Sequence, residues 1–156
     1  MAGLKLDIGA GRRPHKGYQT IDVEAYANPD FLGDFRGMSF VGVEAIRAHH
    51  LLEHFSEAEA VDVLKQWHSW LVPGGQLIVE TPDFAGICLN FVHGDQYWLA
   101  RHAYGDQALP WAFHKSAWYD GKYKSILPKV GFKVLSISFN LSRKILPNIV
   151  VVAEKI

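Results

Sequence analysis

Two glycines and two aspartates near the start of the chain have the types and spacing of a nucleoside-binding site. In "LKLDIGAG", Gly9 and Gly11 follow an apolar strand-like run, and a glycine turn there lets the backbone approach a ligand closely. Asp22 in "TIDVE" ends the next run, where a carboxylate suits the two hydroxyls of a ribose. Asp34 in "GDFRG" ends the third and could accept from an adenine amino group. Each residue alone has a structural explanation as a turn or cap, but together they favour a cofactor site.

The spacing of these residues disfavours a dinucleotide. A dinucleotide fingerprint needs a third Gly or Ala that opens a helix for the pyrophosphate, and an acid about twenty residues further on. Here Arg12, Arg13 and Pro14 follow the glycines, and only ten residues separate Gly11 from Asp22. That interval hardly accommodates a helix, and a Walker lysine is absent as well. The expected site therefore lacks phosphate-binding groups.

The order of elements predicts a single α/β domain over residues 1–156. Apolar strand-like runs cover 4–9, 18–23, 29–35 and 43–50, and a fifth covers 76–82. The pattern predicts a helix over 56–71, with Ser56 and Glu59 as a capping box and "VPGG" as its end. Its expected apolar face consists of Val61, Leu64, Trp67 and Leu71.

The second half of the chain predicts a cap and a final hairpin. Residues 84–115 have weak periodicity, so we expect an irregular cap-like insertion with one helix, lying over the strand ends. Another helix ends near Gly131, and the runs 133–140 and 148–155 are expected to pair as an antiparallel hairpin. Ligands in open α/β sheets bind beyond the carboxyl ends of the strands, which is where the aspartates above fall.

Composition excludes several classes of protein. Lys plus Arg equals Asp plus Glu at 16 each, so the chain has no basic footprint for nucleic acid. The single cysteine, Cys88, cannot form an internal disulfide, and no signal peptide precedes the first strand. Apolar runs such as "IVVVA" are too short to cross a bilayer. We therefore expect a soluble, cytoplasmic protein with no membrane partner.

The motifs resemble those of class I S-adenosylmethionine-dependent methyltransferases. The similar segments are "LKLDIGAG", "TIDVE", "GDFRG", "AHHLLEHF", "LVPGGQLIVETPDF" and "GFKVLSISF" with "NIVVVAEK". Within that superfamily the chain is most similar to a small group in which a short "GxGxxPxxGW" loop replaces the first helix. Tyr18 stands here where that group has tryptophan. A methyl donor carries no pyrophosphate, so the missing helix N-terminus costs such a site little.

The resemblance implies both a fold and a set of donor-binding residues. The fold is a Rossmann-like three-layer sandwich with a seven-stranded, mostly parallel sheet of order 3-2-1-4-5-7-6 and an antiparallel seventh strand. S-adenosylmethionine would be the cofactor and S-adenosylhomocysteine the product. Gly9, Ala10 and Gly11 would lie under the methionine part, and Asp7 would support their turn. Asp22 would hold the ribose, Asp34 with Phe35 would frame the adenine, and His49 and His50 would border the sulfonium.

Three histidines are candidates for the chemistry of a hydroxyl acceptor, which needs a base or a metal that lowers its pKa. His50 and His54 lie one turn apart if "HHLLEH" is helical, and His114 in "FHKS" could close over the acceptor. A metal held by His50, Glu53 and His54 is an alternative, which the resemblance to a Glu-His pair in some metal-binding quinone O-methyltransferases implies. We predict acid-base or structural use and no metal.

The expected reaction is methyl transfer to a small-molecule acceptor, with a sugar or polyol hydroxyl as one option. Arg101 and Tyr104 in the insertion could recognise an anionic or hydroxylated acceptor. A homodimer that completes the acceptor site is a further expectation. Two alternatives stay open: a donor-binding module or partner subunit without turnover, and a nicotinamide oxidoreductase, which the glycine pattern disfavours.

Overall fold

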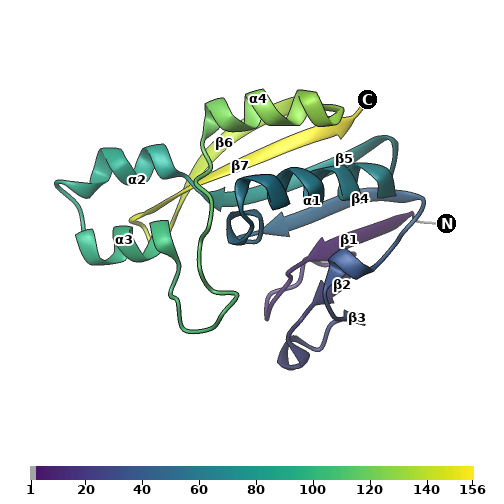
Figure 1. Cartoon of the computed structure of the whole chain (residues 1–156), viewed down its shortest axis with the longest axis horizontal. Coiled ribbons are helices and arrows are strands. Elements are labelled where there is room, and N and C mark those ends of the chain that lie inside the picture. Colours follow the sequence, from purple (N-terminus) through teal and green to yellow (C-terminus); the bar gives the residue numbers. More distant parts are fainter. Residues whose placement is uncertain (1–2) are drawn as a thin grey trace.

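The computed structural model describes residues 3–156 and contains one seven-stranded sheet (Figure 1). The strands run in the order β3-β2-β1-β4-β5-β7-β6. β1 to β5 pair in parallel, and β7 is antiparallel to β5 and to β6. The strands are β1 (Leu4–Ile8), β2 (Gln19–Asp22), β3 (Phe31–Leu32), β4 (Val43–His49), β5 (Leu71–Pro82), β6 (Phe132–Ser142) and β7 (Leu146–Lys155). The predicted strand order and the antiparallel hairpin are confirmed.

All four α-helices follow β4 in the part of the chain that the structure describes. They are α1 (Glu57–Trp70), α2 (Phe84–Phe91), α3 (Gln96–Tyr104) and α4 (Asp120–Val130). The segment between β1 and β4 contains only the short 3₁₀ turns η1 (Ala25–Ala27) and η2 (Phe35–Gly37), and a third turn, η3 (Leu52–His54), follows β4. None of the helices in residues 3–156 is long and apolar enough to cross a membrane.

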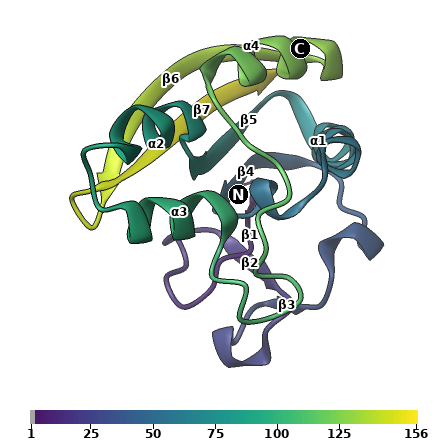
Figure 2. The ribbon, with the colours of Figure 1, turned by 60° about the vertical axis from the view of Figure 1, so that its left-hand side comes forward.

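The two faces of the sheet are covered unequally. α1 and α4 contact each other and cover one face, as Figure 2 shows. On that face the core unites Leu6, Ile46 and Leu77 of the sheet with Trp67 of α1 and Phe132 of β6. The alternating residues of the strands point to the other face, where the loop 9–18 lies against buried Asp7. One helical layer of the expected sandwich is therefore complete, and the other is reduced to this loop.

Helix α1 has the predicted start and an earlier end. Ser56 Oγ accepts from the Glu59 N–H at 3.3 Å, and Glu59 Oε2 accepts from the Ser56 N–H at 2.8 Å, so the capping box forms. The helix ends at Trp70, because Leu71 already pairs with Val43 as the first residue of β5. "VPGG" thus lies within β5 rather than in a loop. The helix buries Ala60, Val63, Leu64, Trp67 and Trp70.

The insertion contains two helices rather than the one expected. Asp83 accepts from the Gly86 N–H at the start of α2, and Asp95 accepts from the Trp98 N–H at the start of α3. Both helices pack against the start of β7, and Ile87, Leu99 and Leu146 form a second small core. Aspartate caps on two separate short helices explain why no single helical period spans the segment.

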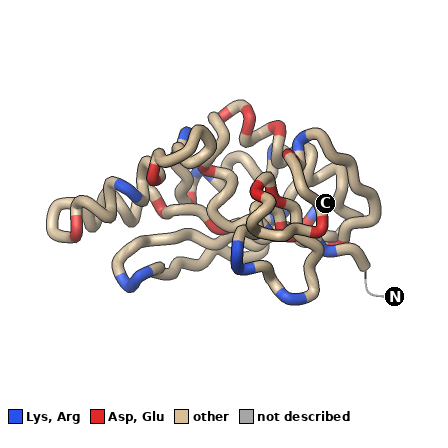
Figure 3. The backbone as a smooth tube through the Cα atoms, turned by 90° about the horizontal axis from the view of Figure 1, so that it is seen from below, with Lys and Arg blue, Asp and Glu red and all other residues tan. Residues whose placement is uncertain are grey.

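The final hairpin is longer than the sequence predicts. β6 and β7 extend through the expected connection, so that Ser142 pairs with Leu146. The turn is thereby reduced to residues 143–145, where Arg143 and Lys144 have left-handed backbone conformations. Figure 3 shows that acidic and basic residues are interspersed along the chain. This extension carries Arg143 next to α3.

We predict that Trp67→Ala destabilises the fold by about 3–5 kcal/mol, because it removes a large side chain that is fully buried in the main core. The free energy of unfolding is measured by urea titration with circular dichroism. Lys65→Ala on the same helix is the control, since that side chain is 64% exposed and its loss should change stability by less than about 0.5 kcal/mol. A loss of less than about 1 kcal/mol for Trp67→Ala would contradict the assignment of this core.

Candidate active site

The glycine turn after β1 is shaped by backbone conformations that favour glycine. Gly9 and Gly11 have φ values of +70° and +55°, in the left-handed region. The Gly9 N–H donates to the Ile21 carbonyl at 2.8 Å, which fixes the turn to β2. A Cβ on Gly9 would lie 3.3 Å from the Leu51 side chain, whereas a Cβ on Gly11 would meet no atom within 4 Å. The turn therefore packs on one side and is open on the other.

Asp22 connects this turn to β2. Its Oδ2 accepts from the Gly11 N–H at 2.8 Å and its Oδ1 accepts from the Glu24 N–H at 2.9 Å. An ionised carboxylate has about four lone-pair sites, so each oxygen can accept a further hydrogen bond. Gly9, Gly11 and Asp22 all line one large cavity of about 570 Å³.

Asp7 supports the turn from beneath and does not line the cavity. It is fully buried, accepts from the His15 N–H at 2.8 Å and forms an ion pair with Arg47 at 2.9 Å. Arg47 Nη2 lies 2.9 Å from Nδ1 of His49. Burial, together with the charge of Arg47, lowers the pKa of His49. Neither His49 nor Ala10 is among the residues that line the cavity, and His49 lies beside Arg47 instead.

Asp34 and Phe35 lie at the other end of this cavity, after β3. The Asp34 carboxylate caps η2 and binds Arg36 through Nε and Nη2, at 3.0 Å and 2.6 Å from Oδ2. The hydrogen bond from Arg36 is the main reason that the pKa of Asp34 is lowered. Phe35 is buried and packs edge-to-face on Phe55. Asp34 therefore already has a cationic partner, which the sequence did not indicate.

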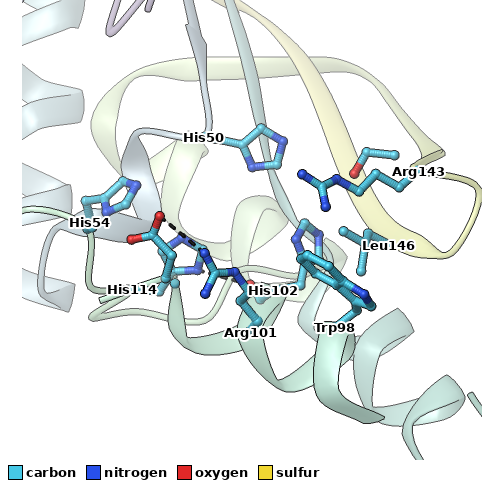
Figure 4. A pocket seen from close by; sticks show the side chains of 12 residues that line it. His50, His54, Trp98, Arg101, His102, His114, Arg143 and Leu146 are labelled. Carbon is cyan, nitrogen blue, oxygen red and sulfur yellow. Dashed lines mark hydrogen bonds and ion pairs between the residues drawn. The ribbon is translucent and has the colours of Figure 1, made fainter. Parts of the chain in front are cut away.

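A second cavity of about 400 Å³ lies between the strand ends and the insertion (Figure 4). Its cationic and polar lining comes from three segments: α3, the strap of residues 105–115 that follows α3, and the tip of the β6–β7 hairpin. The lining includes Arg101, His102, His114, Ser142 and Arg143, with the ring of Trp98. Four residues line both cavities, which therefore meet there: His50, His54, Asp106 and Ala112. Tyr104 is 62% exposed and is not among the lining residues.

His50 lies between two glutamates. Its Nδ1 is 3.2 Å from Glu53 Oε1 and its Nε2 is 3.1 Å from Glu80 Oε1. Burial alone would lower the pKa of His50, but the hydrogen bonds and charges of the two glutamates raise it to about 9. The hydrogen bond from His50 lowers the pKa of Glu80 to about 2. At neutral pH His50 is a cation with both N–H groups engaged, which favours an electrostatic role over that of a base.

His54 and His114 are adjacent, with ring centroids 4.8 Å apart. His54 Nδ1 lies 3.1 Å from the Phe113 carbonyl, and His114 Nδ1 lies 3.0 Å from the His102 carbonyl. Because a carbonyl only accepts, each Nδ1 carries the proton and each Nε2 is left with a lone pair when the ring is neutral. Burial lowers the pKa of His114, which favours its neutral form. The three histidines selected from the sequence therefore lie together.

Several residues in and around the cavities were missed in the sequence. Glu80 lies near the carboxyl end of β5, two residues before Pro82, so the rule that identified Asp22 at the end of β2 could have identified it. His102, Ser142 and Arg143 carried no such signal, because they reach the cavity only through the packing of α3 on the hairpin. Trp111 and Lys115 join the larger cavity from the strap 105–115, a segment without periodicity.

Solved structures with a similar fold include several methyltransferases. A SAM-dependent methyltransferase from Methanosarcina mazei has a TM-score of 0.68 at 16% identity, covering 99% of this chain and 92% of its own. The 1,6-didemethyltoxoflavin N1-methyltransferase of Burkholderia thailandensis, with bound S-adenosylhomocysteine, has a TM-score of 0.68 at 13% identity, covering 98% and 71%. Magnesium protoporphyrin IX methyltransferase from Synechocystis, also with S-adenosylhomocysteine, gives 0.63 at 14%, covering 99% and 75%.

These similarities establish the fold. The chain has the Rossmann-like fold of SAM-dependent methyltransferases, as its motifs predict. Neither a protein-family model nor a curated protein sequence matches the chain. The acceptors of the similar enzymes differ from one another, so the fold does not identify an acceptor for this chain.

We predict that the His50 ring stays protonated through neutral pH in the ligand-free protein and titrates near pH 9, because Glu53 and Glu80 stabilise the imidazolium. The pKa of His50 in the folded protein lies above its unfolded value of about 6.5. The stabilisation of the fold by the charged ring is therefore complete below about pH 6.5 and is lost as the pH rises through about 9. NMR titration of the histidine ring nitrogens measures this.

Glu80→Gln should move the titration of His50 to lower pH, because the variant removes one of the two carboxylate charges. Glu154→Gln is the matched control, since Glu154 pairs with Gln76 at the other end of β5. A His50 midpoint near 6.5 in the unsubstituted protein would contradict the assignment of a charged His50.

Proposed function

We propose that the chain is an S-adenosylmethionine-dependent methyltransferase whose acceptor is a small hydroxylated molecule that carries a negative charge. The observation that carries this proposal is the meeting of two cavities at His50 and His54. Methyl transfer is an in-line displacement that needs the reacting atoms about 3–3.5 Å apart. Two cavities that share a wall allow a donor and an acceptor to approach each other in this way. A site for a single ligand would not require a second cavity.

The larger cavity suits the donor. Its volume of about 570 Å³ lies within the range of roughly 300–1,000 Å³ that small-molecule sites occupy. The spare lone pairs of Asp22 would accept the ribose hydroxyls, while the open side of Gly11 leaves room for the methionine part. Phe35 offers an apolar surface for the adenine, and Asp34 would bind the adenine amino group by sharing its oxygens with Arg36.

The smaller cavity suits a polar acceptor. The Arg143 guanidinium lies 4.6 Å from the centre of the Trp98 ring, and no carboxylate of residues 3–156 lies within 4 Å of it in an ion pair. Arg101 is 3.5 Å from Asp106 and is thus partly neutralised. Arg143, which lies over the Trp98 ring and has Ser142 beside it, would bind a carboxylate or phosphate. An acidic sugar carries such a group together with hydroxyls that could be methylated.

The reaction places chemical demands on the junction of the two cavities. The methyl carbon leaves the sulfonium sulfur and bonds to the acceptor oxygen, so that S-adenosylhomocysteine forms and the hydroxyl loses its proton. The group that weakens this O–H bond must lie where the cavities meet. His54 and His114, with free Nε2 atoms next to Glu53, are the candidates there, whereas His50 is already a cation.

Asp22→Ala should weaken binding of S-adenosylhomocysteine by about 10- to 100-fold, because hydrogen bonds to a charged group contribute about 1.5–3 kcal/mol. Titration calorimetry measures the dissociation constant. Asp62→Ala, an exposed carboxylate on α1, is the control and should bind like the unsubstituted protein. If the unsubstituted chain fails to bind at millimolar ligand, or if Asp22→Ala binds equally well, the donor site is assigned wrongly.

Arg143→Ala should raise KM for an anionic acceptor by about tenfold or more while donor binding is unchanged, since it removes a charge-assisted hydrogen bond. The assay follows transfer of labelled methyl to glucuronate and glucose 6-phosphate, with glucose as the neutral reference. Lys144→Ala is the matched control, because Lys144 is adjacent but does not line the cavity. Equal transfer to glucose would refute the anionic acceptor. Donor binding without methyl transfer to any of the three sugars would support the alternative of a donor-binding module without turnover.

A further inference from the structure

Three metal-ligating side chains converge at the junction of the two cavities. Glu53 and His54 belong to η3, and His114 comes from the strap that follows α3. One potential ligand atom of each lies within 4.8 Å of the other two. Figure 4 shows His54 and His114 at the same end of the smaller cavity.

Both histidines are oriented as metal-binding histidines are. Metal-bound imidazoles usually donate the N–H of the other ring nitrogen to a carbonyl or carboxylate, which fixes the tautomer and the ring orientation. His54 and His114 each donate from Nδ1 to a backbone carbonyl, of Phe113 and His102 respectively. The Nε2 atoms are therefore the free donors, and His114 Nε2 lies 3.9 Å from Glu53 Oε1.

Glu53 supplies an independent observation that indicates a missing ligand. Its side chain is almost fully buried, at 1% exposure. Oε1 accepts from His50, but Oε2 is buried and has no hydrogen-bond partner in residues 3–156. A buried charged oxygen without a partner is costly, and a cation bound to it would remove that cost.

We propose that Glu53, His54 and His114 bind one divalent transition-metal ion, with Zn²⁺ as the best match. Two imidazoles and a glutamate with an open fourth position form the ligand set of catalytic zinc sites, whereas Mg²⁺ and Ca²⁺ prefer oxygen ligands. His50 is not a ligand, because both of its nitrogens are bound to glutamates. At bond lengths of about 2.0–2.1 Å the ligand atoms would stand roughly 3.3 Å apart. Partly exposed His54 can rotate to make that approach.

The position of the ion gives it a role, and this step rests on the proposed function. Because His54 lines both cavities, the open coordination position would face the acceptor. A hydroxyl bound there would have a lowered pKa and would release its proton to solvent before methyl transfer. Oε2 of Glu53 would then have a partner.

The test uses the untagged full chain after treatment with a chelator, titrated with Zn²⁺ by calorimetry and with Co²⁺ by visible absorption. We expect one ion per chain, with the intense absorption bands of tetrahedral Co²⁺. Glu53→Gln and His114→Ala should weaken Zn²⁺ binding at least tenfold, and His93→Ala, an exposed histidine outside the site, should leave it unchanged. Thermal unfolding shows that each variant is folded, and His54→Gln replaces His114→Ala if that variant is not.

The outcomes separate this inference from the proposed function. Absence of stoichiometric Zn²⁺ binding, or binding that the ligand variants do not weaken, overturns the metal site. Titration of the same samples with S-adenosylhomocysteine tests the donor site independently. Zn²⁺ binding without donor binding would support the metal site and refute the proposed methyltransferase. Donor binding without Zn²⁺ binding would overturn the metal site and leave the proposed function standing.

Discussion

Glu53 is the residue on which the arrangement of the site depends, because it joins three parts of the chain. Its backbone carbonyl accepts from the N–H groups of Lys115 and Ser116, which attaches the strap of the insertion to the end of β4. Its side chain accepts from His50 and lies near His114. A carboxylate buried to this extent is tolerated only with partners. The attachment of this segment and, together with Glu80, the charge of His50 therefore depend on this acid.

A second constraint is the short connection between β1 and β2. Without a helix, the loop 9–18 is stabilised by buried Asp7, which binds the His15 N–H and the Arg47 side chain. The cost is that one face of the sheet lacks a helical layer, so that Arg47, His49 and Glu80 are partly exposed.

The sequence predicts the strands and the glycine turn well because both depend on local patterns. Gly9, Gly11 and Asp22 are close in sequence, and their hydrogen bonds form between neighbouring strands. The smaller cavity depends on long-range packing. His102 reaches the cavity because its Nε2 binds the Pro147 carbonyl and Asn148, and no pattern around residue 102 encodes that contact. Arg143 is placed by two strands that extend beyond their predicted ends.

The difference between local patterns and long-range contacts also explains why the protonation state of His50 could not be predicted. Its neighbour in sequence, Glu53, is visible in "HHLLEHF", but the second glutamate comes from β5, thirty residues away. The hydrogen bonds and charges of the two carboxylates together raise the pKa of His50 to about 9, which favours its charged form at neutral pH. With His50 hydrogen-bonded to the glutamates, proton chemistry near the junction falls to histidines whose second ring nitrogen has a free lone pair. Among the histidines of the cluster, His54 and His114 meet that condition next to an unsatisfied carboxylate oxygen, so base catalysis and metal binding compete for the same two side chains.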